Sequence, residues 1–394
     1  MDNNKEYTTA DFPRLKIALL HYWFITWRGG EEVVRSILKL FPQAEIYTLF
    51  YDPKLIEREH ITQRITASKL NNPFLRKHYQ KIFPLYPYGV SSLKLSQNYD
   101  LIISSESGPI KGVEKPESTP HLCYIHTPMR YCWGFENDYL ETIPSFLRYS
   151  VKYFFHQLKK WDVKTIANVD HFVANSKNVA ARVEQFYQRK SSVCYPPIRE
   201  DLFQKENITK REAAQKEYYL SFGAITPYKK IDLLVDTFNT NKKKLVIIGD
   251  GSEKKKLERR AGENIEFLGT LEWREISSLI LSARALIFPG EEDFGMVPLE
   301  VMAHGVPVIA FEKGGALETV VMIPGQPEKS TGVFFPEQTV ESLTGAIHTF
   351  EKQETHFVPE TIQFHAKQFA EEKFLRHFSN EVLSLLNKKT GIKY

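Results

Sequence analysis

The sequence has little cysteine and lacks long apolar runs. Its only cysteines, Cys123, Cys132 and Cys194, have spacings that fit neither a disulfide framework nor a zinc knuckle. No apolar run approaches the roughly 18 residues needed to span a bilayer. Residues 1–14 carry charged side chains in place of the apolar segment of a signal peptide. These absences argue against a disulfide-stapled secreted protein and predict a cytoplasmic one.

Length and charge point to two unequal halves. A chain of 394 residues, 42% of them apolar, can fill two domains of about 200 residues each. Residues 1–200 hold 27 Lys or Arg against 20 Asp or Glu, whereas residues 201–394 hold 25 against 28. The first half is therefore the one expected to meet anions.

Short apolar runs separated by helical stretches predict buried parallel strands. They lie at residues 16–20, 101–104, 122–125, 171–174, 218–222, 245–248, 265–268, 285–288 and 306–310. The repeated order of strand and helix predicts an α/β protein with two doubly wound, Rossmann-like parallel sheets. Ligands of such sheets bind at the carboxyl ends of the strands, so a shared ligand is expected in a cleft between the two domains.

The domain boundaries are predicted from prolines and from a final amphipathic pattern. Pro196 and Pro197 end a strand and precede a polar segment, which predicts a first domain at residues 1–198 and a second at 199–370. Residues 371–394 are expected to form a closing helix, with a return to the first domain as one option.

The most informative segment, residues 289–310, predicts a strand end, a loop, a helix and another strand. Pro298 suits the first helical turn, so nearby backbone N–H groups are free to face an anion such as a nucleoside diphosphate. These N–H groups belong to Phe294, Gly295, Met296 and Val297. Glu292 in the loop and Glu300 in the helix share this region without facing each other as a glycosidase pair would.

With its glycines and flanking strands, this segment closely resembles the Glu-x7-Glu motif of retaining family 4 glycosyltransferases, which have the GT-B fold. The resemblance extends over nearly the whole chain. It implies that Glu292 contacts the transferred sugar and that Glu300 holds the ribose hydroxyls of the nucleotide.

Two motifs of the first half follow predicted strands. Gly29 and Gly30 allow a backbone to approach phosphate closely, although a tight turn requires the same residues. The resemblance assigns them to the donor phosphate and the acceptor. His126, Arg130 and Tyr131 lie in a segment similar to that of the mannosyltransferase-like branch, which assembles bacterial surface polysaccharides. That similarity implies a hydrogen bond from His126 to a donor-sugar hydroxyl, while Arg130 and Tyr131 either shape an acceptor pocket or simply pack.

Residues 221–232 resemble the segment in which the family places an arginine and a lysine against the donor diphosphate. Lys229 keeps the lysine role, and it joins His126 and Glu292 as an expected catalytic residue. Ala224 stands where the arginine is expected, which removes a bidentate phosphate donor. Lys230 or Arg28 offers replacement charge; a weakened catalyst is the alternative.

Further turns of the second half complete the expected donor site. Gly249 and Asp250 fit a turn under the nucleobase, and residues 314–318 resemble the loop that closes over the diphosphate, although both also fit purely structural turns. No Asp-x-Asp segment is present to hold a divalent metal against the diphosphate. We therefore expect no metal, and no cofactor apart from a nucleoside-diphosphate sugar as co-substrate.

One helical stretch, residues 146–164, has an apolar stripe bordered by basic residues. The stripe consists of Leu147, Val151, Phe154, Leu158 and Trp161, and the border of Arg148, Lys152 and Lys159. The pattern fits either a core-facing helix or a helix on an anionic membrane. Residues 69–94 form a second candidate surface. Together with the positive first half, they suggest contact with the inner face of the plasma membrane and a polyprenyl-linked acceptor.

The resemblance thus implies a hexosyltransferase that moves mannose from GDP-mannose to a glycan or lipid-linked acceptor in surface polysaccharide or lipopolysaccharide synthesis. No nucleic-acid partner is expected. Two rivals remain open: a nucleotide-sugar epimerase or hydrolase of the same architecture, and a degenerate subunit that binds nucleotide sugar and assists a partner transferase.

Overall fold

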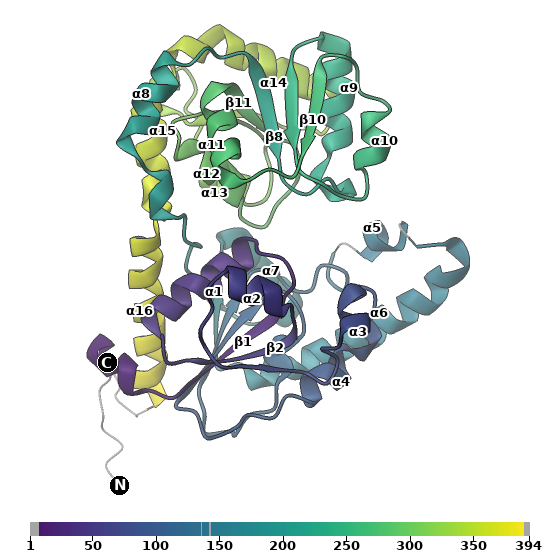
Figure 1. Ribbon diagram of the computed structural model, residues 1–394, viewed down its shortest axis with the longest axis vertical. Helices are drawn as coiled ribbons and strands as arrows, with labels where there is room; N and C mark the ends of the chain where they lie inside the picture. Colours follow the sequence, from purple (N-terminus) through teal and green to yellow (C-terminus); the bar gives the residue numbers. More distant parts are fainter. Residues whose placement is uncertain (1–7, 135, 142, 390–394) are drawn as a thin grey trace. The chain divides into compact units, whose positions relative to one another are not determined.

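The computed structural model describes residues 8–134, 136–141 and 143–389, and the chain folds into two compact units (Figure 1). The first unit contains Met1–Pro197 and Glu372–Tyr394, and the second contains Ile198–Glu371. Both breaks lie one residue from the divisions suggested by the sequence. Residues 1–7, within the segment considered for a signal peptide, and residues 390–394 of the expected closing helix lie outside the described residues.

A seven-stranded sheet forms the centre of the first unit, in the order β3-β2-β1-β4-β5-β6-β7. The strands are β1 Ile17–Phe24, β2 Glu45–Tyr51, β3 Ile65–Ala67, β4 Leu101–Glu106, β5 His121–Ile125, β6 His171–Ala174 and β7 Ser191–Val193. Every residue of β4 is buried, as expected of a parallel strand covered on both faces. The register pairs His21 of β1 with Ser105 of β4 near the carboxyl ends of both strands, where the strand order reverses.

Helices surround this sheet. They are α1 Gly29–Leu40, α2 Pro53–Arg58, α3 Pro73–Lys77, α4 Tyr86–Ser91, α5 Glu136–Glu141, α6 Ser145–Thr165, α7 Lys177–Tyr187 and α16 Glu371–Lys389. Helix α1 shows why such segments become helical: Glu31 in its first turn accepts a hydrogen bond from the Arg28 N–H at 2.9 Å, and Val33 and Ile37 are fully buried. None of the helices in the described ranges is long and apolar enough to span a membrane.

The final helix, α16, belongs to the first unit, so the return that the sequence left as one option is the arrangement in the structure. Phe374, Phe378 and Val382 share one hydrophobic core with residues of β1 and β4, and the rings of Phe378 and Tyr124 lie 6.0 Å apart. Truncation of a buried phenylalanine to alanine typically costs about 3–5 kcal/mol. Residues from the end of the chain therefore stabilise strands formed near its beginning.

The second unit repeats the plan with six parallel strands, in the order β10-β9-β8-β11-β12-β13. The strands are β8 Tyr218–Phe222, β9 Leu245–Ile248, β10 Ile265–Gly269, β11 Ala283–Phe288, β12 Val308–Phe311 and β13 Gly332–Phe335. The helices are α8 Lys205–Ala213, α9 Ile231–Asn241, α10 Lys254–Glu258, α11 Trp273–Ser282, α12 Met296–Met302, α13 Ala316–Thr319, α14 Val340–Gln353 and α15 Pro359–Ala366. The prediction of two Rossmann-like parallel sheets is confirmed.

Candidate active site

The loops after β8 and β11 bring Lys229 and Glu292 into contact. The two strands are neighbours in the sheet, so their carboxyl ends are adjacent. Lys229 Nζ donates a hydrogen bond to Glu292 Oε1. The side chains of Lys229 and Glu292 are 20% and 17% exposed, so solvent and a ligand can reach the pair. An expected phosphate-binding cation and an expected sugar-binding carboxylate thus meet at one edge of the second sheet.

A small pocket lies beside this ion pair. Its lining comes from the ends of β8, β9 and β11 and includes Ser221, Ala224, Lys229 and Gly290. Lys229 is the one charged side chain among the described residues of the lining. Ala224 therefore adds a methyl group to the wall where the family resemblance calls for a second cation.

Two glycines let the loops around the pocket pack backbone against backbone. Gly249 has a φ of 137°, and a Cβ atom there would lie 1.9 Å from the carbonyl oxygen of Gly223. A Cβ atom on Gly315 would lie 2.2 Å from the Cα atom of Phe294. No other residue fits at these approaches without moving the neighbouring loop. The Gly249 turn thus supports the β8 loop, and the loop after β12 supports the segment that follows Glu292.

Helix α12 starts where the sequence suggested an anion could meet backbone N–H groups. Gly295, with a φ of 99°, directly precedes Met296, the first residue of α12. Phe294 is buried, whereas Met296 and Val297 are half-buried. Glu300 follows in α12, half-buried, and its carbonyl oxygen contacts His304 Nδ1 at 2.8 Å. All these residues thus lie on the same loop and helix as Glu292.

Lys230 and Asp250 lie in the adjoining loops. Lys230 has a left-handed φ of 55° and directly precedes α9. The carbonyl oxygen of Asp250 accepts a hydrogen bond from the Ile225 N–H at 2.9 Å, and its Oδ1 accepts one from the Gly251 N–H at 2.7 Å. Asp250 thereby ties the β9 loop to the β8 loop.

In the first unit, His126 is half-buried and joins a chain of three buried polar side chains. Its Nε2 lies 2.8 Å from Ser105 Oγ, which lies 3.2 Å from His21 Nδ1. The other ring nitrogen of His21, Nε2, is 3.6 Å from Glu31 Oε1. This row of contacting side chains runs from α1 through β1 and β4 to the end of β5. It links the predicted residue His126 to three residues that the sequence analysis did not select.

The carboxylate at one end of this row of side chains determines which atoms donate and which accept its hydrogen bonds. Glu31 is too far from His21 Nε2 for a hydrogen bond, but a carboxylate 3.6 Å away still favours the tautomer with the proton on Nε2. His21 Nδ1 then accepts a hydrogen bond from the Ser105 hydroxyl, and Ser105 Oγ accepts one from His126 Nε2–H, so that Nδ1 of His126 becomes the acceptor. Burial, together with nearby His21, lowers the pKa of His126 to about 3. His126 is therefore a neutral imidazole near pH 7 with an acceptor nitrogen suited to a hydroxyl group.

The glycine pair lies beside His126. Gly29 is the first residue of α1, and a Cβ atom on Gly30 would lie 2.7 Å from Tyr22 Oη and 3.8 Å from His126 Nε2. The absent side chain of Gly30 leaves room for these rings. The structure thus brings Gly29, Gly30 and His126 together at one edge of the first sheet.

The two residues expected on the acceptor side lie in the turn after β5. The Tyr131 ring is 5.8 Å from the Phe155 ring and 6.3 Å from the Phe83 ring, and its hydroxyl contacts Met129 Sδ at 3.1 Å. These contacts are those of a packed side chain. Arg130 is half-buried in the same turn.

A buried charge cluster supports the first-unit loops and was also missed from sequence. Lys111 Nζ donates to Asp162, which further accepts hydrogen bonds from Trp133 Nε1 at 2.9 Å and Tyr187 Oη at 2.8 Å. Glu106 accepts from the Lys111 N–H at 2.8 Å, and burial raises the pKa of its carboxyl to about 8. The Glu106 carbonyl oxygen also accepts from the His126 N–H at 2.7 Å. This cluster therefore holds the backbone that presents His126.

A signal for these residues was present in the sequence. Ser105 and Glu106 directly end the apolar run of β4, the position from which side chains of parallel strands reach a site. The same rule had selected His126 at the end of β5.

In residues 8–134, 136–141 and 143–389, no group of three or more His, Cys, Asp or Glu side chains is arranged to hold a metal ion. Cys123, Cys132 and Cys194 are buried free thiols.

Two family models match consecutive parts of the chain. The model of Glycosyltransferase Family 4 matches residues 27–202, and that of Glycosyl transferases group 1 matches residues 203–367. Their junction lies close to the first break between the structural units.

Relatives and solved structures agree with these matches. An uncharacterised glycosyltransferase of Methanocaldococcus jannaschii is 27% identical over 300 residues, which cover 73% of this chain and 76% of that protein. The α-1,3/1,6-mannosyltransferase ALG2 of Kluyveromyces lactis is 28% identical over 291 residues, 58% of this chain and 56% of that enzyme. The structure of Anabaena HepE in complex with UDP has a TM-score of 0.68 at 19% identity, covering 94% of this chain and 100% of that one.

The two parallel sheets have the GT-B fold, which the chain shares with its structural neighbours. The chain belongs to the glycosyltransferases that combine a family 4 domain with a group 1 domain. Mannosyltransferases are among its relatives at modest identity, including an O-antigen chain mannosyltransferase of Escherichia coli, 24% identical over 46% of this chain and 51% of that enzyme.

Proposed function

We propose that this protein is a retaining hexosyltransferase that moves mannose from GDP-mannose to a glycan or polyprenyl-linked acceptor in cell-surface polysaccharide synthesis. The contact between Lys229 and Glu292 carries the proposal, because it brings the cation expected to bind the diphosphate against the carboxylate expected to bind the sugar, at the carboxyl edge of the second sheet. The mannosyltransferases among the relatives support the choice of mannose.

The second unit would hold the donor. Lys229 would contact the diphosphate and stabilise the negative charge that develops as the nucleoside diphosphate leaves. Glu292 would then bind hydroxyls of the transferred sugar, and Glu300 those of the ribose. The structural neighbour HepE was solved with UDP bound, which supports a nucleotide as the ligand of this fold.

The first unit would contribute His126 and the acceptor side. The acceptor nitrogen of a neutral imidazole can receive a hydrogen bond from a sugar hydroxyl without bringing positive charge to the reacting carbon. Departure of the diphosphate would leave an oxocarbenium-like centre, which the acceptor hydroxyl would attack from the face that the leaving group vacates. The new bond to the acceptor oxygen replaces the bond to the phosphate oxygen, and the hydroxyl proton passes to the departing diphosphate.

Metal independence is part of the proposal. Lys229 and backbone N–H groups would neutralise the diphosphate in place of a divalent metal ion. The rate of transfer should therefore be unchanged when EDTA is added, and a loss of turnover restored by Mg²⁺ would refute this part alone.

Mass spectrometry of a lipid-linked oligosaccharide acceptor, incubated separately with GDP-mannose and with UDP-glucose, tests the whole proposal. We expect one added hexose with GDP-mannose. Addition only from UDP-glucose would overturn the donor assignment, and conversion of the donor sugar without an acceptor would identify an epimerase or a hydrolase.

One observation favours a second candidate function, that of a nucleotide-sugar-binding subunit that assists a partner transferase. Ala224 lines the pocket in which Lys229 is the one charged side chain among the described residues. Ala224→Arg separates the two functions. If the natural protein binds donor and transfers nothing, while the variant transfers sugar, the chain acts as the weakened subunit.

A further inference from the structure

Helix α6 has two contrasting faces. One face carries Phe155, Leu158 and Asp162, all buried, and Trp161 packs partly buried against the same core. Leu158 and Trp161 belong to the apolar stripe noted in the sequence, so for them the core-facing interpretation is the one that the structure shows. Figure 1 shows the first turns of α6 projecting from the rest of the first unit.

The first turns are exposed on more than one face: Leu147 and Phe154 of the apolar stripe are 43% and 42% exposed. Away from that stripe, three aromatic side chains are more exposed still. Phe146 is 81% exposed, Tyr149 87% and Tyr153 56%. Their spacings of three and four residues place them in one row along the helix. Exposed aromatic groups that lie together in this way mark a binding surface far more often than scattered ones do.

The same row continues with basic side chains toward the end of the helix. His156, Lys160 and Lys164 follow Tyr153 at spacings of three, four and four residues, and all three are exposed. They line an open pocket that also includes Trp133 and Lys159.

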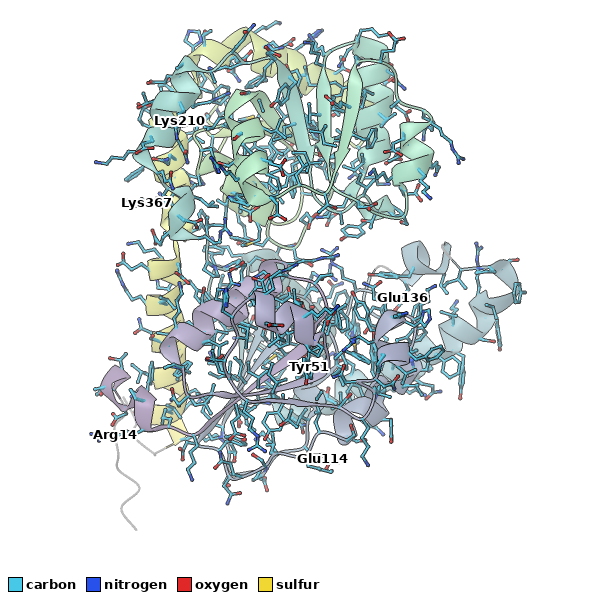
Figure 2. All side chains as sticks on the ribbon, viewed as in Figure 1. Arg14, Tyr51, Glu114, Glu136, Lys210 and Lys367 are labelled. Carbon is cyan, nitrogen blue, oxygen red and sulfur yellow. The ribbon has the colours of Figure 1, made fainter. Side chains whose placement is uncertain are left out.

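The charge of α6 has a single sign at its surface. Its lysine, arginine and acidic side chains are Arg148, Lys152, Lys159, Lys160, Lys164 and Asp162. Asp162, the only acid, is fully buried against Lys111. Lys159 lies 3.4 Å from Glu136 of α5, which is labelled in Figure 2. The exposed face of α6 therefore carries aromatic rings in its first turns and positive charge in the turns that follow.

We propose that this outer face of α6 docks on a membrane surface rich in anionic phospholipids. Phe146, Tyr149 and Tyr153 would enter the interfacial region, where aromatic rings are favoured. Lys160 and Lys164 would contact lipid phosphates. A membrane fits both chemistries at once, because it offers an apolar layer and negative charge side by side. The inference extends the proposed function, since it names the surface at which a lipid-linked acceptor would be met, but it depends on no step of sugar transfer.

Flotation of the full chain with vesicles provides the test. Vesicles of phosphatidylcholine with phosphatidylglycerol should carry the protein upward, and vesicles of phosphatidylcholine alone should not. The double variant Lys160→Glu and Lys164→Glu should weaken binding by more than tenfold, because each lysine near an anionic surface contributes about a fivefold gain. Phe146→Ser combined with Tyr149→Ser should weaken it by a comparable factor.

Matched variants on the second unit serve as controls. Lys255→Glu with Lys256→Glu makes the same charge change on α10, and Phe364→Ser removes an aromatic ring that is 71% exposed. Neither should alter flotation, and thermal unfolding should show that all variants are folded. The proposal is overturned if the natural protein stays with the unbound fraction, if both vesicle types bind equally, or if the α6 variants float like the controls. A dimer in analytical ultracentrifugation that the Phe146 and Tyr149 changes dissociate would assign the face to a second copy instead.

Discussion

The two sheets carry their candidate site residues in different ways. In the second unit, a partly exposed cation and carboxylate, Lys229 and Glu292, face each other on loops held by close backbone packing. In the first unit, His126 is held through Ser105 and His21 in a buried chain that ends at Glu31. The first arrangement can exchange partners when an anionic ligand arrives. The second keeps one ring in one protonation state and one orientation.

This contrast indicates how the two units would share the work of sugar transfer. A diphosphate brings charge, so its site requires charges that water and ligand can reach. A sugar hydroxyl brings none, and a fixed neutral acceptor recognises it without the cost of desolvating a charge. Each of the following substitutions tests one of these two arrangements.

The largest effect is expected from removal of either charge in the second unit. Lys229→Ala and Glu292→Ala should each lower the rate of transfer by about 10²- to 10³-fold, as does the loss of one preorganised group that stabilises developing charge. Single-turnover kinetics with saturating donor would measure this. Glu291→Ala, at the exposed neighbouring position, should leave the rate unchanged, and an equal loss there would indicate a general disturbance of the loop.

A smaller effect is expected in the first unit. Ser105→Ala frees His126 to rotate and to change its tautomer, so kcat should fall by about tenfold with little change in KM, within the range of one positioned proton-transfer or hydrogen-bonding group. The ¹⁵N chemical shifts of the His126 ring should shift from a single Nε2–H tautomer to a mixture. Ser104→Ala is the control, because Ser104 Oγ bonds His121 Nε2 at 2.8 Å and belongs to no part of the chain that ends at His126. Identical ring shifts in the natural protein and the Ser105 variant would refute the assignment.

The ion pair between Lys229 and Glu292 predicts that one variant gains affinity for nucleoside diphosphate. Glu292→Gln removes the competitor that Lys229 must leave to reach a diphosphate, and a partly exposed pair of this kind is worth about 1 kcal/mol. Calorimetry should therefore show nucleoside diphosphate binding about fivefold tighter, even though sugar transfer is slower. Weaker binding in this variant would mean that Glu292 does not compete for Lys229.

The smallest effect concerns acid stability. Because the pKa of His126 is lowered to about 3 in the folded protein, the unfolded chain binds this proton first as the pH falls. The free energy of unfolding should therefore decrease from about pH 6.5 downward, until the folded state is protonated as well. His126→Asn should make this decline shallower in urea titrations, whereas exposed His348→Asn should not. An unchanged slope in the His126 variant would show that the ring is not held neutral.

Much of the fold was predictable because its strands are short, buried and continuous. Each apolar run selected from the sequence coincides with a strand, whereas β2, β3, β7 and β13 were not selected. Strand β3 and strand β7 have only three residues each and lie at sheet edges, where burial leaves little pattern to detect. The final helix was found from its apolar spacing, but its packing partners in β1 and β4 depend on contacts between distant segments.

The candidate site was predictable only where a motif carried it. Lys229 and Glu292 stand in patterned loops, and Gly30 stands in the first turn of α1. The structure brings Lys229 against Glu292 and Gly30 near His126, while their roles toward a donor stay predictions. His21 and Ser105 were missed because their contact arises from strand register, which pairs them across 84 positions. Glu31 was missed because its approach to His21 depends on how α1 packs on the sheet. The outer row of α6 was missed for another reason: a helical wheel shows two apolar rows there, and the structure leaves side chains of both exposed in the first turns, including Leu147 and Phe154 of the stripe selected from the sequence.

The return of α16 to the first unit has a consequence for synthesis. Because Phe374, Phe378 and Val382 complete a core begun by β1 and β4, that core cannot close while the ribosome is still making the second unit. The second unit, contiguous from Ile198 to Glu371, can finish folding first. During translation the first unit therefore keeps an apolar face uncovered until α16 has been made. Such a face is a binding site for chaperones.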